Sequence, residues 1–213
     1  MIYKRLFSEE LSREYIKRLS IDEVKLIEDF CISNSKFIFP LLKKLERYTS
    51  LDIERGVFTS KEIEQFNSIP VPENYNLRKE LPVTIYRGLT ISKELAKQIV
   101  PKIKAKKGKI TYTPQESNYS SWTTDKETAE SFSHGSYSSD LEVVFRANLT
   151  PKNKAIDIVT FQMITFNLQK YLEQKDSLND KQKELLNIIK NVDRIDEKEI
   201  LVFGKIKVDG IEE

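Results

Sequence analysis

The chain has 213 residues, and its 35 basic and 33 acidic side chains give a formal net charge of only +2. Its 32% charged and 39% hydrophobic residues are ordinary for a globular protein, and this length suits one domain with or without a helical appendage. The single cysteine, Cys31, excludes an internal disulfide and Cys-rich metal sites, while the single histidine, His134, excludes motifs with two histidines. We therefore expect any chemistry to use carboxylates, hydroxyls, arginine or an organic cofactor, and no metal.

Targeting and membrane signals are not expected in this sequence. No stretch approaches the roughly 20 apolar residues that span a bilayer. The opening residues, MIYKRLFSEELSREY, lack the apolar run of a signal peptide. We expect a cytoplasmic protein with no membrane partner.

The first 80 residues are predicted to be mainly helical. Ser20 and Glu23 form a capping-box pattern ahead of apolar residues at helical spacing. A second helix is predicted over residues 37–45, with Pro40 in its first turn. Ser60 is predicted to cap a third helix that ends near Phe66.

Strand patterns begin at Leu81 and continue to the end of the chain. Strands are predicted at residues 81–89, 109–114, 120–124, 141–149, 155–158 and 199–208, and helices at 92–103, 124–132 and 161–190, the last broken near Asn179. These short strands do not alternate with helices of similar length, which favours a split or mixed sheet over a doubly wound parallel one. The predicted fold class is α+β, with a helical region over residues 1–80 and a second domain over residues 81–213.

Tyr86-Arg87-Gly88 is the first of three segments that could contribute to one site. An arginine at a strand end offers several hydrogen-bond donors to a phosphate or a ribose hydroxyl, and the glycine leaves the backbone approachable. The same residues also fit a solvated arginine on an edge strand.

Ser120-Ser-Trp-Thr-Thr124 is the second segment. On an extended strand, Ser121 and Thr123 share one face and Trp122 points to the other. The two hydroxyls could orient a neighbouring carboxylate while the tryptophan lies in the core. A half-buried strand that ends in a helix cap is the alternative.

Glu197-Lys198-Glu199 is the third segment, at the start of the last predicted strand. In an extended strand the two carboxylates lie on the same face, with their Cα atoms about 6.5–7 Å apart, and Lys198 points away. Paired acids are costly in a purely structural strand. The alternative is a solvated charged run, since the surrounding residues are also charged.

In this order and spacing, the three segments resemble the signatures of the arginine–serine–glutamate class of mono-ADP-ribosyltransferases. This family includes bacterial toxins, vertebrate ectoenzymes and the Alt and Mod enzymes of T-even phages, and the resemblance covers roughly residues 80–207. It implies an ADP-ribosyltransferase-like split sheet, made of two packed antiparallel or mixed β-sheets. Two positions depart from the usual motif: Trp122 replaces a small hydroxyl residue, and Thr123 replaces a serine.

The resemblance implies NAD as co-substrate and gives roles to five residues. Arg87 would contact the ribose or the phosphates, and the Gly88 backbone would bind the nicotinamide amide. Ser121 would hold the carboxylate of Glu199, and Thr123 would supply the second inward hydroxyl. Glu199 would be the catalytic carboxylate, because breaking the nicotinamide bond leaves an oxocarbenium-like sugar that a fixed negative charge stabilises.

The resemblance also implies an acceptor. Glu197 would face it, and a glutamate at this position favours the guanidinium of an arginine on a target protein of a host cell. Residues 187–196 would recognise that target, and Tyr137 is expected to stack on the nicotinamide. The similarity is greatest to intracellular or phage-delivered enzymes, so we expect a phage or bacterial effector that acts in the host cytoplasm.

Three alternatives remain open at this point. An NAD glycohydrolase would use the same residues with water as the acceptor. A non-catalytic domain would only bind a partner. A nucleic-acid partner is not expected from the charge balance, although the lysine run over residues 102–109 leaves RNA binding as an alternative to a solvated helix end.

Overall fold

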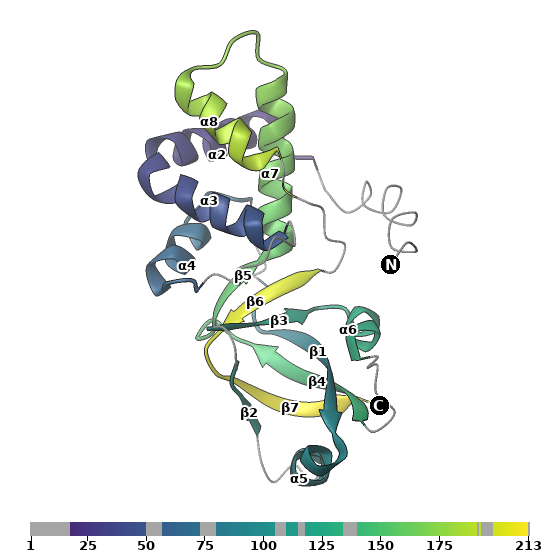
Figure 1. Cartoon of the computed structure of the whole chain (residues 1–213). Coiled ribbons are helices and arrows are strands. Elements are labelled where there is room, and N and C mark those ends of the chain that lie inside the picture. Colours follow the sequence, from purple (N-terminus) through teal and green to yellow (C-terminus); the bar gives the residue numbers. More distant parts are fainter. Residues whose placement is uncertain are drawn as a thin grey trace. The chain divides into compact units, whose positions relative to one another are not determined.

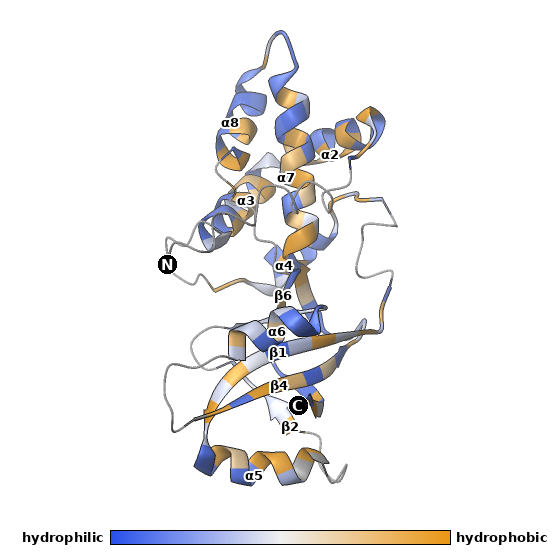
Figure 2. Ribbon diagram, turned by 90° about the vertical axis from the view of Figure 1, so that its right-hand side faces the viewer, coloured by the Kyte–Doolittle hydropathy of each residue, from blue (hydrophilic) through white to orange (hydrophobic). Residues whose placement is uncertain are grey.

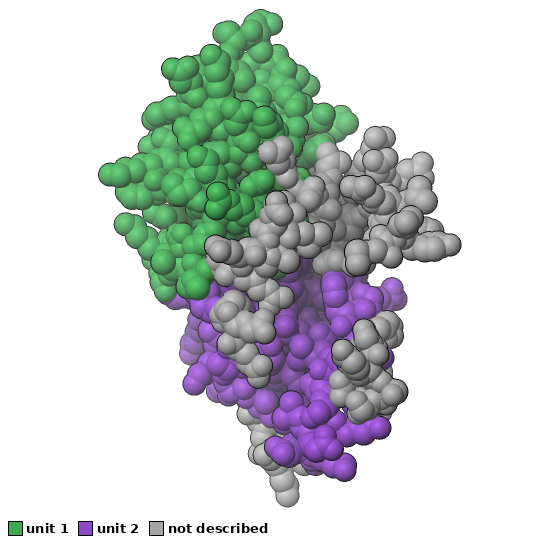
Figure 3. Space-filling view, viewed as in Figure 1, with its two compact units in different colours: residues 1–77, 158–196 green, residues 78–157, 197–213 purple. Residues whose placement is uncertain are grey.

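The computed structural model describes residues 18–49, 57–72, 80–104, 110–114, 118–133, 140–190, 192 and 198–212. These residues form an α+β protein with seven helices and seven strands in the described part of the chain. The chain divides into two compact units, each built from two segments (Figure 3). Unit 1 contains residues 1–77 and 158–196, and unit 2 contains residues 78–157 and 197–213.

The division differs from the predicted boundary in one respect. The first change of unit lies close to residue 80, but residues 158–196 belong to the helical unit and not to the sheet. The reason is the packing of α7 (Ile158–Glu173), which follows the sheet directly in sequence yet buries Phe161, Ile164 and Leu168 completely. Its neighbours are the N-terminal helix α2 (Ile21–Ser33) and α8 (Asp180–Ile189).

The remaining helices of unit 1 are α3 (Ser35–Thr49) and α4 (Ser60–Asn67), which pack on each other (Figure 1). The capping box of Ser20 and Glu23 is confirmed at the start of α2. The predicted cap at Ser60 is wrong by one residue, because Thr59 accepts the hydrogen bond from the Glu62 backbone.

Pro40 does not lie in the first turn of its helix, as the sequence predicted. Helix α3 begins at Ser35, directly after Asn34 has ended α2, so Pro40 lies inside the helix. The early start is supported by the Asn34 carbonyl, which accepts hydrogen bonds from the backbone amides of Phe37 and Ile38.

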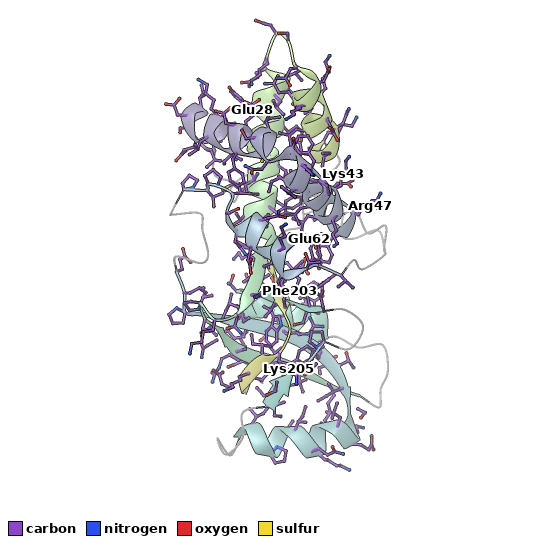
Figure 4. The ribbon with its side chains drawn as sticks, turned by 90° about the vertical axis from the view of Figure 1, so that its left-hand side faces the viewer. Glu28, Lys43, Arg47, Glu62, Phe203 and Lys205 are labelled. Carbon is purple, nitrogen blue, oxygen red and sulfur yellow. The ribbon has the colours of Figure 1, made fainter. Side chains whose placement is uncertain are left out.

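A buried ion pair links three parts of unit 1. The carboxylate of Glu28 on α2 is only 5% exposed and lies 2.8 Å from the Lys175 ammonium, which follows α7 (Figure 4). Gln182 on α8 donates a further hydrogen bond of 2.7 Å to the same carboxylate. A buried carboxylate requires such partners, so this cluster fixes α2 against the two C-terminal helices of the unit.

Unit 2 is built on one sheet. Its strands are β1 (Val83–Ser92), β2 (Ile110–Tyr112), β3 (Tyr119–Thr123), β4 (Asp140–Leu149), β5 (Lys154–Asp157), β6 (Glu199–Phe203) and β7 (Ile206–Glu212). Their order is β2-β7-β4-β1-β3-β6-β5, and every neighbouring pair is antiparallel (Figure 1). The prediction of two separate sheets is therefore corrected to one hydrogen-bonded sheet.

The junction between β1 and β3 is the weakest link in that sheet. Strand β1 pairs with β4 over ten positions, but with β3 only through Tyr86 and Thr123. The strands β2-β7-β4-β1 and β3-β6-β5 thus form two groups that meet at a single residue pair. Continued pairing would put Gly88 opposite Ser121, and the two strands separate before that point.

The sequence predicted one continuous strand over residues 199–208, which is wrong because the structure has two strands there. Residues 199–208 contain the whole of β6 and the start of β7, which lie in different strand groups. Gly204 allows the break because its φ of +71° lies in the left-handed region, which glycine adopts without a steric penalty. Its backbone amide donates to the Asn118 carbonyl at 2.9 Å.

Two helices pack on strands of unit 2. Helix α5 (Lys93–Lys104) is amphipathic, as its alternating colours in Figure 2 show, and it packs on β7 and β1. Helix α6 (Lys126–Ser133) packs on β1, β4 and β3. None of the described helices has the length and apolar character needed to cross a membrane.

Candidate active site

Ser121 and Glu199 meet across β3 and β6, although they are 78 positions apart in sequence. The antiparallel register pairs Thr123 with Glu199 and Ser121 with Leu201, so alternation of side chains places all four on one face. Ser121 Oγ donates a hydrogen bond to Glu199 Oε1. Glu199 is only 7% exposed, so this hydroxyl satisfies an oxygen that water scarcely reaches.

The opposite face of β3 belongs to the core. Trp122 is 1% exposed, and its indole N–H donates to Ser120 Oγ at 2.8 Å. The ring of Tyr112 on β2 meets the Trp122 ring edge-on, with centroids 6.0 Å apart. A tryptophan in the middle of the second segment is therefore a core anchor that leaves the hydroxyls of Ser121 and Thr123 on the other face.

Arg87 links the first segment to the backbone of β3. Its Nη1 donates to the backbone carbonyl of Ser121, near the place where β1 and β3 have separated. Its guanidinium lies over the Tyr112 ring, 5.3 Å from the centroid, which is the geometry of a cation–π contact. The Nε of Arg87 is buried and has no hydrogen-bond partner among the described residues.

Gly88 is required by the close approach of α6 to β1. A Cβ atom at this position would lie 1.8 Å from the Ala129 carbonyl oxygen and 2.8 Å from the Ser133 backbone nitrogen. Thr90 strengthens the same contact, since its hydroxyl donates to the Ser133 carbonyl at 2.9 Å. The glycine therefore has a packing reason as well as the expected role in leaving its backbone approachable.

Asp125 caps α6, so this helix begins two residues after its predicted start at residue 124. Its Oδ1 accepts from the backbone amides of Glu127 at 3.0 Å and Thr128 at 3.3 Å. Although burial raises the pKa of Asp125, hydrogen bonds from the Lys198 side chain and these backbone amides outweigh it and hold the pKa below its ordinary value.

The third segment is not an extended strand throughout. Strand β6 begins at Glu199, and Lys198 has a φ of 44° in the left-handed region. The alternation argument for two carboxylates on one face therefore does not apply across Lys198. Its side chain reaches Asp125, with 3.1 Å between Nζ and Oδ2.

Several predicted residues lie outside the described part of the chain. These are the proposed acceptor residue Glu197, the proposed stacking residue Tyr137, the single histidine His134, most of the target-recognition segment beyond residue 190, and residues 105–109 of the lysine run. Their roles stay predictions from the resemblance.

Three residues contact the site although no role in it was predicted for them from the sequence. Tyr112, Asp125 and Lys198 owe their places to contacts between distant strands and helices, which local patterns do not reveal. Asp125 alone had a usable signal, because an aspartate at the start of a helix is a favoured N-cap. The helix was instead predicted to begin at Thr124.

Neither metal binding nor thiol chemistry finds support in the described residues. No cluster of three or more His, Cys, Asp or Glu side chains in that part of the chain could hold a metal ion. Cys31 is fully buried in unit 1, and burial together with the nearby Glu28 charge raises its pKa to about 12. Its thiol therefore stays protonated and is a poor nucleophile near neutral pH.

Comparisons of this chain with protein-family models, curated proteins and solved structures found no match. Any function of the chain must therefore be inferred from the contacts of Ser121, Glu199 and Arg87.

Proposed function

We propose that this protein is a mono-ADP-ribosyltransferase that moves ADP-ribose from NAD to an arginine side chain of a target protein. The observation that carries the proposal is the buried Glu199 carboxylate, which accepts a hydrogen bond from Ser121. Arg87, the first signature residue, donates to the backbone carbonyl of Ser121 and lies over the Tyr112 ring that packs on Trp122. The order and spacing of these residues resemble the arginine–serine–glutamate class.

The proposed reaction needs a fixed negative charge. The bond between C1′ of the nicotinamide ribose and the ring nitrogen breaks, and its electron pair leaves with neutral nicotinamide. The sugar becomes oxocarbenium-like, and the Glu199 carboxylate stabilises the developing positive charge. A guanidine nitrogen then bonds to C1′ and loses one proton, for which Glu197 is the proposed base.

Arg87 has the chemistry to hold the co-substrate. A guanidinium carries five N–H donors, and in Arg87 one nitrogen binds the Ser121 carbonyl while Nε has no described partner. The Tyr112 ring limits the movement of the group. A guanidinium held in this way suits a phosphate or a ribose oxygen, which is the role that the resemblance implies for Arg87.

The sheet also supports the proposal. Its two strand groups meet only at Tyr86 and Thr123, and Arg87 and Ser121 lie directly beside that junction. An ADP-ribosyltransferase-like split sheet requires such a separation, with NAD held where the strands part. The near-division into two strand groups is thus compatible with an ADP-ribosyltransferase-like arrangement, although the strands form one hydrogen-bonded sheet and not two.

Label transfer from NAD tests the proposed function. NAD labelled in its adenosine part is incubated with host lysate, or with agmatine as a small guanidine acceptor, and with wild type, Glu197→Ala or Glu199→Ala protein. We expect labelled products with the wild type, loss of labelling with both variants, and retained nicotinamide release with Glu197→Ala.

Three other results would each change the proposal. Nicotinamide release by the wild type without any labelled acceptor would favour an NAD glycohydrolase, which the same Ser121–Glu199 contact supports. No nicotinamide release at all would contradict both enzymes and favour a domain that only binds a partner. Unchanged labelling by Glu197→Ala would refute the acceptor role of that residue alone.

A further inference from the structure

Lys198 adopts a backbone conformation that its own chemistry disfavours. Among the described non-glycine residues it alone has a positive φ, at 44°. A side chain with a Cβ is strained in the left-handed region, so such a conformation persists only where the surroundings hold it. The residue directly after it is Glu199, the first residue of β6.

The side chain of Lys198 has a fixed partner. Its Nζ lies 3.1 Å from Asp125 Oδ2, and the two side chains are 41% and 30% exposed. Most surface ion pairs contribute little because both side chains must be ordered to form them. Here one partner is already ordered, since the other oxygen of Asp125 accepts the backbone amides of Glu127 and Thr128 at the start of α6.

Asp125 is also anchored to β3. Its backbone amide donates to Thr123 Oγ1 at 3.1 Å, and Thr123 is paired with Glu199 in the sheet. Strand β3 leads into α6 and runs beside β6 (Figure 1). The contact therefore ties the residue before Glu199 to the end of the strand that carries Ser121.

We propose that Lys198 and Asp125 are positioning residues whose ion pair holds the left-handed turn before β6 and so keeps the Glu199 carboxylate aligned with Ser121. This inference rests on the proposed function, because its consequence is an effect on turnover. Neither residue needs to touch NAD. Removing either charge should loosen the start of β6 and leave Glu199 in place only part of the time.

The test compares four variants in the full chain. Lys198→Met removes the charge but keeps most of the stem, and Asp125→Asn removes the charge but keeps a side chain that caps helices well. The double variant removes both, and Lys198→Arg restores a cation. Lys205→Met is the matched control, since Lys205 is an exposed lysine in the turn after β6 (Figure 4).

The readout is kcat for nicotinamide release and KM for NAD, with the thermal midpoint measured alongside. We expect Lys198→Met and Asp125→Asn each to lower kcat about tenfold, because small misplacements of a catalytic group cost at least that much. KM should stay within about twofold, since Arg87 is untouched. The double variant should be no worse than either single one, and Lys198→Arg should recover most of the rate.

Other results would overturn the inference. Unchanged kcat in Lys198→Met, a loss equal to that of Lys205→Met, or additive losses in the double variant would each show that the pair does not position Glu199. Any of these with an active wild type would leave the proposed function intact. A wild type that releases no nicotinamide would contradict the proposed function, and this inference would fall with it.

Discussion

Two adjacent serines on β3 have different partners. Single substitutions at these two residues can therefore be compared directly. Ser121 donates to the Glu199 carboxylate, whereas Ser120 accepts from the Trp122 indole at 2.8 Å in the core. Both side chains are small hydroxyls on the same short strand. A substitution at each one therefore separates a contribution to the proposed chemistry from a contribution to packing.

Ser121→Ala should lower nicotinamide release about tenfold to a hundredfold, the worth of one hydrogen bond to a charged group. The free energy of unfolding should also fall, by about 1–3 kcal/mol, because the buried Glu199 carboxylate loses a donor. Ser120→Ala should keep turnover but lower the free energy of unfolding by about 1 kcal/mol, because the buried indole N–H loses its partner. Turnover assays and urea unfolding of both variants check that the two serines differ in their effect on turnover. Equal effects on turnover would contradict the role of Ser121.

Gly88→Ala should destabilise unit 2 by about 3 kcal/mol, the upper part of the usual range for overpacking. The added Cβ would meet backbone atoms of α6 at 1.8 Å and 2.8 Å, which cannot rotate away. Gly204→Ala is the control, since no atom lies within 4 Å of its added Cβ and only its φ of +71° opposes the change. We expect about 1 kcal/mol there. A smaller loss at Gly88 than at Gly204 in urea unfolding would contradict the close approach of α6.

Among the secondary-structure elements of unit 1, two ion pairs that link helices differ in their burial. Glu28 on α2 is held by Lys175 and Gln182, whereas Lys43 on α3 and Glu184 on α8 form a pair whose side chains are each 52% exposed (Figure 4). Burial decides the worth of such pairs, because a buried charge without its partner cannot be solvated.

Lys175→Met should therefore lower the free energy of unfolding by about 3 kcal/mol, since it leaves the Glu28 charge buried. Adding Glu28→Gln to that variant should recover most of the loss, because a neutral amide costs less to bury. Lys43→Met should change stability by about 0.5 kcal/mol or less. Urea unfolding of the three variants is the measurement, and a similar loss in Lys43→Met and Lys175→Met would be the contrary result.

The link between α3 and α4 should depend on pH. Although burial raises the pKa of Glu62, hydrogen bonds from the Thr59 backbone and from Lys44 outweigh it and hold the pKa below its ordinary value of 4.5. Lys44 Nζ lies 3.0 Å from Glu62 Oε1. A carboxylate whose pKa falls on folding contributes stability that is present above its unfolded pKa and is lost as the pH falls through its folded pKa.

The thermal midpoint of Glu62→Gln should thus lie below that of the wild type at pH 6, and the gap should close as the pH falls below about 4.5. Glu64→Gln, two residues further along α4, is the control and should give a smaller gap. A gap that widens on acidification would reverse the sign of the proposed contribution.

At the scale of the whole molecule, the sequence predicted local features better than long-range ones. The Ser20–Glu23 capping box and the strands near residues 81–89 and 141–149 were found, because caps and alternation are local signals. The packing of α7 with the N-terminal helices was not predicted, because the apolar residues of α7 would fit a partner in either unit. The break at Gly204 was also missed, because one glycine inside an apolar run does not reveal that the next strand joins another group.

The candidate site shows the same limit. Ser121 and Glu199 are 78 positions apart, and no periodicity could bring them together. Only the resemblance of three short motifs predicted that contact. The Arg87–Tyr112 and Lys198–Asp125 contacts are equally distant and belong to no motif, so they became visible only in the fold.

The proposed function requires the Glu199 carboxylate to drive the cleavage of NAD. The most direct test is the rate of nicotinamide release by the wild type, by Glu199→Gln, which keeps the shape but not the charge, and by Glu142→Gln on the exposed part of β4. We predict a loss of about 100-fold to 1,000-fold in Glu199→Gln with an unchanged thermal midpoint, and a normal rate in Glu142→Gln. Equal rates in Glu199→Gln and the wild type would contradict the claim.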